Sequence, residues 1–194
     1  MRFTDERVLF DGAGVPVAAR SSYHGGRERE VELVTRPLEV GERLGVLGPW
    51  LELARDQGFV PAHDGALHFH FDCEPWMHTG TLRSLVLGWT ARRDELLRDW
   101  EPRQDNPLWR GPFSDELIEQ VAASRDDAPF VELARAIREL DPPKTPDWNI
   151  RNVVSTRPRH PPLEARMWNA AVVLDRVETS FQATVAFLQS LRAP

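Results

Sequence analysis

The residues best suited to chemistry in this chain are two histidines and an aspartate that alternate along one short stretch. His68, His70 and Asp72 occupy every second position of residues 66–72, and the positions between them are apolar. A period of two is typical of a β-strand, so one face would pack on the core while these three side chains line the other, about 7 Å apart. Such a row of imidazole and carboxylate groups is suited to binding a metal ion. A half-exposed strand whose polar face only contacts water has the same pattern.

Two further segments alternate in the same way. Their polar faces would be formed by Glu28, Glu30 and Glu32 in residues 27–35, and by Glu164, Arg166 and Trp168 in residues 163–169. A carboxylate two residues from a guanidinium is commonly a surface ion pair, and it can equally be a metal ligand beside a phosphate-binding group. If the three strands are neighbours, carboxylates, imidazoles and an arginine line one surface, a set that suits Mg²⁺ or Mn²⁺.

The composition narrows the class of protein and of partner. The 194-residue chain has a formal net charge of -6 and a pI near 5.5, which argues against nucleic acid or an anionic membrane as the main partner. It has one cysteine, Cys73, and no apolar stretch long enough for a membrane span, so we expect a cytoplasmic protein. Lys144 is the only lysine, which excludes a lysine-based phosphate-binding loop and favours arginine as the group that contacts phosphate or carboxylate.

Hydrophobic periodicity predicts strands interleaved with longer helices. The expected strands are residues 7–10, 15–19, 27–35, 66–72, 148–156 and 163–169, and the expected helices are residues 44–56, 79–100, 114–123, 129–140 and 175–192. Because there is no short strand–helix–strand rhythm, we expect an α+β fold in a single domain over residues 1–194. Its antiparallel, partly closed sheet would carry helices on one face.

The order of the motifs resembles the putative amidoligase family, which is related to glutamine synthetase and glutamate–cysteine ligase. The segments that carry the resemblance are residues 32–38 (ELVTRPL), 67–72 (LHFHFD), 103–106 (RQDN), 148–150 (WNI) and 163–169 (LEARMWN). At these places the family pattern has a Glu-containing segment, a His-x-His strand, an Arg-x-Asp-Asn loop, an asparagine-bearing segment and a Glu-x-Arg strand. The match extends over roughly residues 28–194.

The resemblance implies an activity and a set of site residues. In the family, ATP bound with Mg²⁺ or Mn²⁺ on the inner face of a glutamine synthetase-like sheet would phosphorylate a carboxylate, and an amine would then displace phosphate to form an amide. By similarity, the metal ligands are Glu32, His70, Glu164 and Asp72, the catalytic residues are Arg166 and His68, and the cofactor contacts come from Arg166, Arg103 and Asn106. Metal ions and an arginine would neutralise charge on the transferring phosphoryl group.

The chain departs from the family pattern at its first strand. Family members usually begin with a Glu-x-Glu strand, which residues 1–26 lack, so residues 1–27 are expected to be divergent or truncated. The expectation is therefore a complete or incomplete amide-forming ligase for small-molecule or peptide substrates. A second copy or a partner protein would cover the open sheet edge. The alternatives are a catalytically degenerate binding or interaction module of the same fold and a metal-dependent hydrolase.

Overall fold

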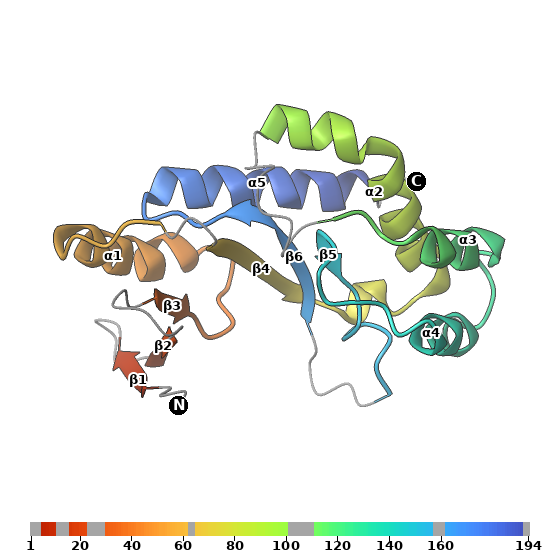
Figure 1. Cartoon of the computed structure of the whole chain (residues 1–194), viewed down its shortest axis with the longest axis horizontal. Coiled ribbons are helices and arrows are strands. Elements are labelled where there is room, and N and C mark those ends of the chain that lie inside the picture. Colours follow the sequence, from red (N-terminus) through yellow and green to blue (C-terminus); the bar gives the residue numbers. More distant parts are fainter. Residues whose placement is uncertain are drawn as a thin grey trace. The chain divides into compact units, whose positions relative to one another are not determined.

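The structure, a computed structural model, describes residues 5–10, 16–22, 30–61, 65–100, 111–156 and 162–191, with side chains from residue 33 onward. The strands are β1 (Asp5–Phe10), β2 (Pro16–Ser22), β3 (Glu30–Val34), β4 (Ala66–Asp72), β5 (Trp148–Asn149) and β6 (Pro162–Asn169). The helices are α1 (Arg43–Asp56), α2 (Thr79–Trp100), α3 (Asp115–Ala123), α4 (Phe130–Glu139) and α5 (Leu174–Ser190), with a short 3-10 helix η1 (Glu74–Trp76) (Figure 1).

The strands form two antiparallel sheets of three strands each. Their orders are β1-β2-β3 and β4-β6-β5. The mixture of helices with antiparallel strands is therefore confirmed. Neither sheet closes on itself within the described residues, so the partly closed sheet that we expected is not what these strands form.

The chain divides into two compact units. The smaller unit comprises Met1–Ala62 with Val172–Leu174, and the larger unit comprises His63–Ala171 with Asp175–Pro194. All three strands of the β4-β6-β5 sheet belong to the larger unit, which is therefore the one that holds the candidate site. Among the helices that the structure describes, none is long and apolar enough to cross a membrane.

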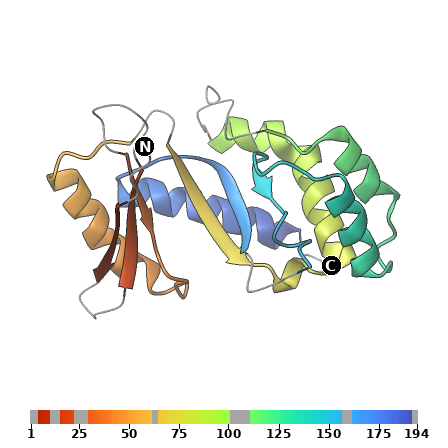
Figure 2. The ribbon, with the colours of Figure 1, turned by 60° about the horizontal axis from the view of Figure 1, so that its bottom comes forward.

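Helix α5 covers one face of the β4-β6-β5 sheet. In both ribbon views it runs along β4 and β6 on a single side (Figures 1 and 2). Phe181 of α5 contacts Phe69 edge-on at 5.4 Å and stacks on Phe71 at 5.9 Å between ring centroids. These are the apolar positions of the alternating strand, so the prediction that this face of β4 packs against a helix is confirmed.

Helix α2 supplies much of the core because its apolar residues recur at helical spacing. Its buried stripe consists of Thr79, Leu82, Leu85, Val86, Trp89, Leu96 and Leu97. Trp89 lies at the centre of an aromatic cluster, with ring centroids 5.9 Å from Trp148 on β5 and 5.3 Å from Phe187 on α5. This cluster fixes α2, α5 and the sheet against one another.

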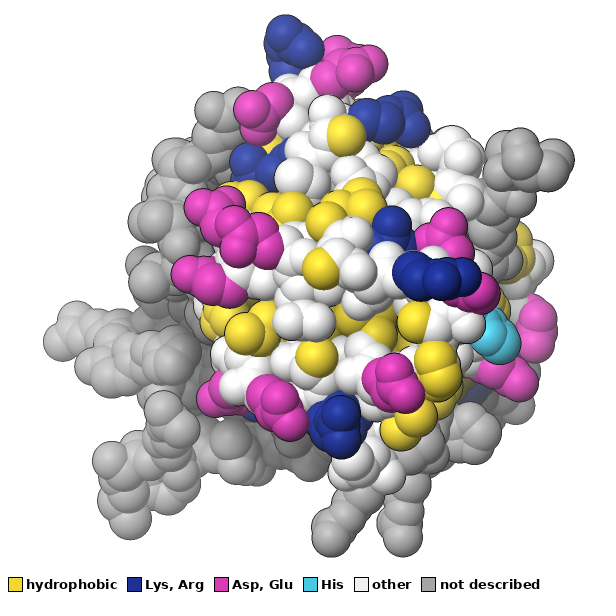
Figure 3. All heavy atoms as spheres, turned by 90° about the vertical axis from the view of Figure 1, so that its right-hand side faces the viewer, with side chains coloured by type: hydrophobic (Ala, Val, Ile, Leu, Met, Phe, Trp, Pro, Cys, Tyr) yellow, Lys and Arg dark blue, Asp and Glu magenta, His cyan; other side chains and the backbone are white. Residues whose placement is uncertain are grey.

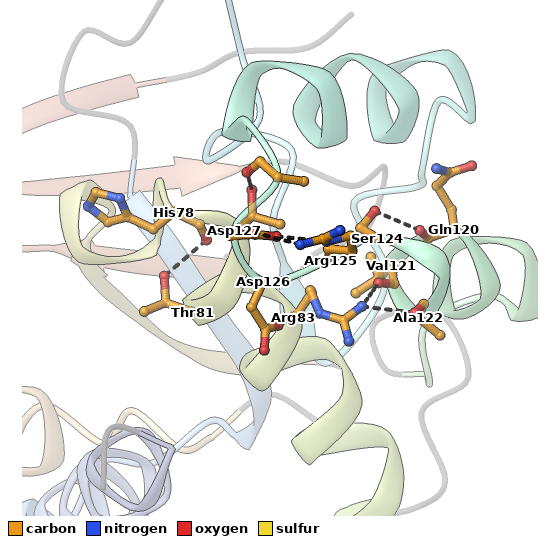
Figure 4. A network of polar contacts seen from close by, with 12 residues as sticks. His78, Thr81, Arg83, Gln120, Val121, Ala122, Ser124, Arg125, Asp126 and Asp127 are labelled. Atoms are coloured by element: carbon orange, nitrogen blue, oxygen red, sulfur yellow. Dashed lines mark hydrogen bonds and ion pairs between the residues drawn. The ribbon is translucent and has the colours of Figure 1, made fainter. Parts of the chain in front are cut away.

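Helices α3 and α4 follow, and a polar network holds the end of α3. Ser114 caps α3, because its side-chain oxygen accepts a hydrogen bond from the backbone N–H of Leu117 at 3.3 Å. Arg83 of α2 donates to the last carbonyls of α3, Val121 and Ala122, and to Asp126 (Figure 4). The outer surface on this side mixes acidic, basic and apolar side chains (Figure 3).

Strand β5 is much shorter than the predicted strand over residues 148–156. It ends at Asn149, whose side-chain oxygen accepts the backbone N–H of Arg151 at 3.2 Å. That bond starts a turn, and Val154 N–H then donates to Ile150 C=O. An asparagine side chain can hydrogen-bond to a nearby backbone group that would otherwise pair in a sheet. The side chain of Asn149 therefore ends the strand, although the apolar residues after it predicted a longer one.

Candidate functional site

The polar faces of β4 and β6 meet across one antiparallel ladder. His70 lies directly opposite Glu164, and Phe69 lies opposite Ala165. Residues that face each other across a ladder share a face of the sheet, so the polar residues of the two strands lie together on the side away from Phe181. Their alternating patterns predicted that the polar faces of these two strands share one site if the strands are neighbours, and the structure brings them together.

A β-bulge in β6 limits that polar face. Phe69 pairs with Ala165 but Leu67 pairs with Trp168, so two residues of β6 oppose the single residue His68. The extra residue reverses the alternation, and Trp168 joins the face of Leu67. Trp168 is 5% exposed, and its Nε1–H donates to Thr184 Oγ1 on α5 at 2.8 Å. The prediction that Trp168 shares a face with Glu164 and Arg166 was therefore wrong.

Four nitrogen-bearing side chains converge on the carboxylate of Glu164. Arg166 Nη1 donates to its Oε1 at 2.6 Å, and Asn149 Nδ2 donates to its Oε2 at 2.8 Å. His68 Nδ1 and His70 Nε2 lie 3.2 Å and 3.4 Å from Oε1. We call these five residues the Glu164 cluster. It joins all three strands of the sheet, since Asn149 comes from β5.

The cluster keeps Glu164 ionised. Burial alone would raise the pKa of Glu164, but hydrogen bonds from His70 and Asn149 and the charges of Arg166 and His68 outweigh it and lower the pKa to about 2. The side chains of Glu164 and Arg166 are 9% and 10% exposed, while that of His70 is 53% exposed. The ion pair thus lies beneath a face that reaches solvent through His70.

Sequence reasoning did not assign a site role to Asn149. The segment Trp148-Asn149-Ile150 was noted only as part of the family pattern. Asn149 is 4% exposed and lies opposite Glu164 in the β5–β6 ladder. Its amide donates to Oε2 of Glu164, while Arg166 donates to Oε1. A polar residue between two large apolar residues was the signal that could have identified it.

Of the other predicted site residues, Asp72 is the one whose side chain the structure describes, and it is not part of the cluster. Asp72 is exposed and lies opposite Pro162, and its Oδ1 accepts the backbone N–H of Glu74 at 3.0 Å, at the start of η1. Glu32 belongs to β3 in the smaller unit, and its side chain is outside the described residues. Arg103 and Asn106 also lie outside the described residues.

The Glu164 cluster does not fit a divalent metal by itself. Both carboxylate oxygens already accept hydrogen bonds, and a cation at Oε1 would have to displace the guanidinium of Arg166. Among the residues with described side chains, no group of three or more His, Cys, Asp and Glu residues could hold a metal ion. Of the predicted metal ligands, His70 and Glu164 lie together and Asp72 lies apart from them, while the side chain of Glu32 is outside the described residues.

The cluster is arranged to present donors. An arginine, two imidazoles and an amide surround one carboxylate, and a guanidinium or imidazole can bind an oxyanion such as a phosphoryl or carboxylate group. The Glu164 carboxylate would orient these donors. Comparison with protein-family models, with curated proteins and with solved structures finds no match for this chain.

Proposed function

We propose that the chain carries the nucleotide- and carboxylate-binding face of an ATP-dependent carboxylate–amine ligase with a glutamine synthetase-like catalytic fold, and that this face is incomplete by itself. The observation that carries the proposal is the direct pairing of His70 with Glu164 beside Arg166. Two of the motifs that carry the amidoligase resemblance, in residues 67–72 and 163–169, lie in neighbouring strands, and this supports the proposal.

In this reaction a carboxylate oxygen attacks the terminal phosphorus of ATP and ADP leaves. The amine nitrogen then attacks the acyl carbon, phosphate leaves, and the nitrogen loses a proton. Arg166 would contact the phosphoryl oxygens while Glu164 holds the guanidinium in place, and the exposed imidazole of His70 would donate to the same oxygens. Because the cluster does not fit a metal by itself, the ligands for Mg²⁺ would have to come from other residues.

Calorimetric titration with ATP and MgCl₂ tests the binding half of the proposal. Arg166→Lys keeps the charge but loses the planar fork, so ATP affinity should fall by about tenfold or more. Arg125→Lys is the matched control, because Arg125 makes a two-bond contact to Asp127, at 2.9 and 2.8 Å, on the exposed surface. If the wild type does not bind ATP, or if both variants bind it equally well, the proposal is wrong.

A catalytically degenerate binding module is the second candidate. It is favoured by the engagement of both Glu164 oxygens and by the lack of a metal-holding group among the described side chains. Phosphate release in the presence of Mg-ATP, a carboxylate and an amine separates the two candidates. The ligase predicts slow release that depends on both substrates and is abolished by Glu164→Gln. The module predicts binding of ATP with release no faster than that of the variant.

A further inference from the structure

A buried aspartate outside the Glu164 cluster links the cluster to the longest helix. Asp147 is 0% exposed and lies immediately before β5. Its Oδ2 accepts two hydrogen bonds from α2, from Arg93 Nε at 2.6 Å and from Trp89 Nε1 at 3.2 Å. The side chain therefore ties the start of β5 to the middle of α2.

The main chain of Asp147 reaches the cluster directly. Its carbonyl oxygen accepts the backbone N–H of Arg166 at 2.7 Å, and its own N–H donates to the carbonyl of Gly111 at 2.9 Å. Asn149, two residues further on, donates to Glu164. Asp147 thus hydrogen-bonds to the backbone of Arg166 and directly precedes β5, the strand that contains Asn149.

Strand β5 needs such an anchor because it is only two residues long. Its ladder with β6 consists of Trp148 opposite Ala165 and Asn149 opposite Glu164. A slip of one residue would turn Asn149 to the other face of the sheet and take its amide away from Glu164. The contact of Trp148 with Trp89 at 5.9 Å and the bonds of Asp147 to α2 oppose that slip.

The chemistry of Asp147 argues against a purely stabilising role. Burial raises the pKa of its carboxyl group, although hydrogen bonds and charge from Arg93, the indole N–H of Trp89 and the backbone N–H of Gly111 act in the opposite direction. Its Oδ1 has no hydrogen-bond partner among the described residues. Well-packed apolar residues are often at least as stabilising as a buried ion pair of this kind. The better-supported role of such a pair is to select one packing arrangement of the elements that it joins.

We infer that Asp147 is the positioning residue of the candidate site, which holds β5 and the backbone of Arg166 in the register that places Asn149 and Arg166 on Glu164. The inference concerns how the cluster is assembled, so it goes beyond the proposed ligase activity and does not require it. Asp147 acts through Asn149 and Arg166 and contacts no substrate in this role.

The test compares Asp147→Asn with a destabilising variant elsewhere in the same core. Leu117→Ala, at a 1% exposed position on α3, is the control. The readouts on the full chain are the melting temperature and the NMR resonances of the imidazoles of His68 and His70, which lie far from residue 147 in the sequence. We expect both variants to lower the melting temperature, and only Asp147→Asn to shift the imidazole resonances, because only it displaces Glu164.

A second variant keeps the test decisive if Asp147→Asn does not fold. Arg93→Gln removes the strongest partner of the same carboxylate at a side chain that is 23% exposed. It should shift the same imidazole resonances as Asp147→Asn. If the folded variants lower the melting temperature while the imidazole resonances stay at their wild-type positions, as in Leu117→Ala, Asp147 is a structural residue only and the inference fails.

Discussion

Glu164 is the residue through which every contact of the cluster passes. Its two oxygens accept from Arg166 and Asn149, and both imidazoles of β4 lie against Oε1. Replacing Arg166 would leave a buried carboxylate without its cation, while replacing Glu164 would leave the guanidinium without its anion. Either change is costly in a low-dielectric site, so both residues affect folding as well as binding.

The pH dependence of stability should report the state of Glu164. Its folded pKa of about 2 lies below the ordinary value of 4.5, so its contribution is fully present above pH 4.5 and is lost as the pH falls toward 2. With partial solvent screening we expect a loss on the order of 2 kcal/mol. Urea unfolding between pH 6 and pH 3 should show that the wild type loses stability faster than Glu164→Gln. Parallel curves would contradict this.

Helix α2 offers a matched pair of glycines for testing how close its packing is. A Cβ at Gly88 would lie 2.6 Å from Leu191 Cδ2, whereas a Cβ at Gly80 would meet Asp126 at an ordinary 3.7 Å. Replacing glycine by alanine within a helix stabilises the folded state by up to about 1 kcal/mol. We therefore expect Gly80→Ala to stabilise the protein, and Gly88→Ala to gain less because Leu191 must move. Urea unfolding of the two variants checks this order, and the reverse order would refute it.

The ends of helices and strands could be predicted where they depend only on nearby residues, such as an alternating pattern or a glycine. Residues 66–72 form β4 as predicted, and α1 ends at Asp56, the residue at which the predicted helix ends, with Gly58 at φ +80° just beyond it. The failures came from interactions that periodicity does not contain. Asn149 ended β5 through its side chain, and the bulge in β6 moved Trp168 to the core face.

The site was predictable to the extent that it depends on alternation. His68, His70, Glu164 and Arg166 come together because two alternating strands are neighbours in one sheet. Asp147 was not predictable, because its role depends on the distance from β5 to Arg93 and Trp89 on α2, which no local pattern encodes. Asp72 shows the opposite case, since it fits the alternation but its carboxylate accepts the backbone N–H of Glu74 at the start of η1.

At the scale of the whole molecule, the two compact units differ in how much they bury. Helix α1 of the smaller unit buries Val46, Gly48 and Leu51 and contains Pro49, whereas α2 of the larger unit buries seven residues. Native-state hydrogen exchange should therefore show amides of α1 opening at a lower free energy than those of α2. Equal opening free energies in both helices would show that the units unfold together.

Phosphate release by this chain alone should be slow. Both oxygens of Glu164 already accept hydrogen bonds from Arg166 and Asn149, and phosphoryl transfer depends on metal ions and on close positioning of the phosphates. With Mg-ATP, amino acids and amines we expect a rate on the order of 10⁻³ s⁻¹ or less, far below the common range for enzymes. A coupled phosphate assay measures this, and turnover near 1 s⁻¹ would refute the expectation.

The bulge in β6 divides the strand into two parts whose alternating side chains can be changed independently in protein engineering. Residues before it face the cluster through Glu164, and Trp168 after it faces α5 through Thr184. Ligand preference could thus be redesigned in the first half of the strand while the second half continues to anchor the helix. A one-residue deletion at Met167 would remove the bulge and place Arg166 directly opposite His68, while Trp168 would stay opposite Leu67 on the face that packs on α5.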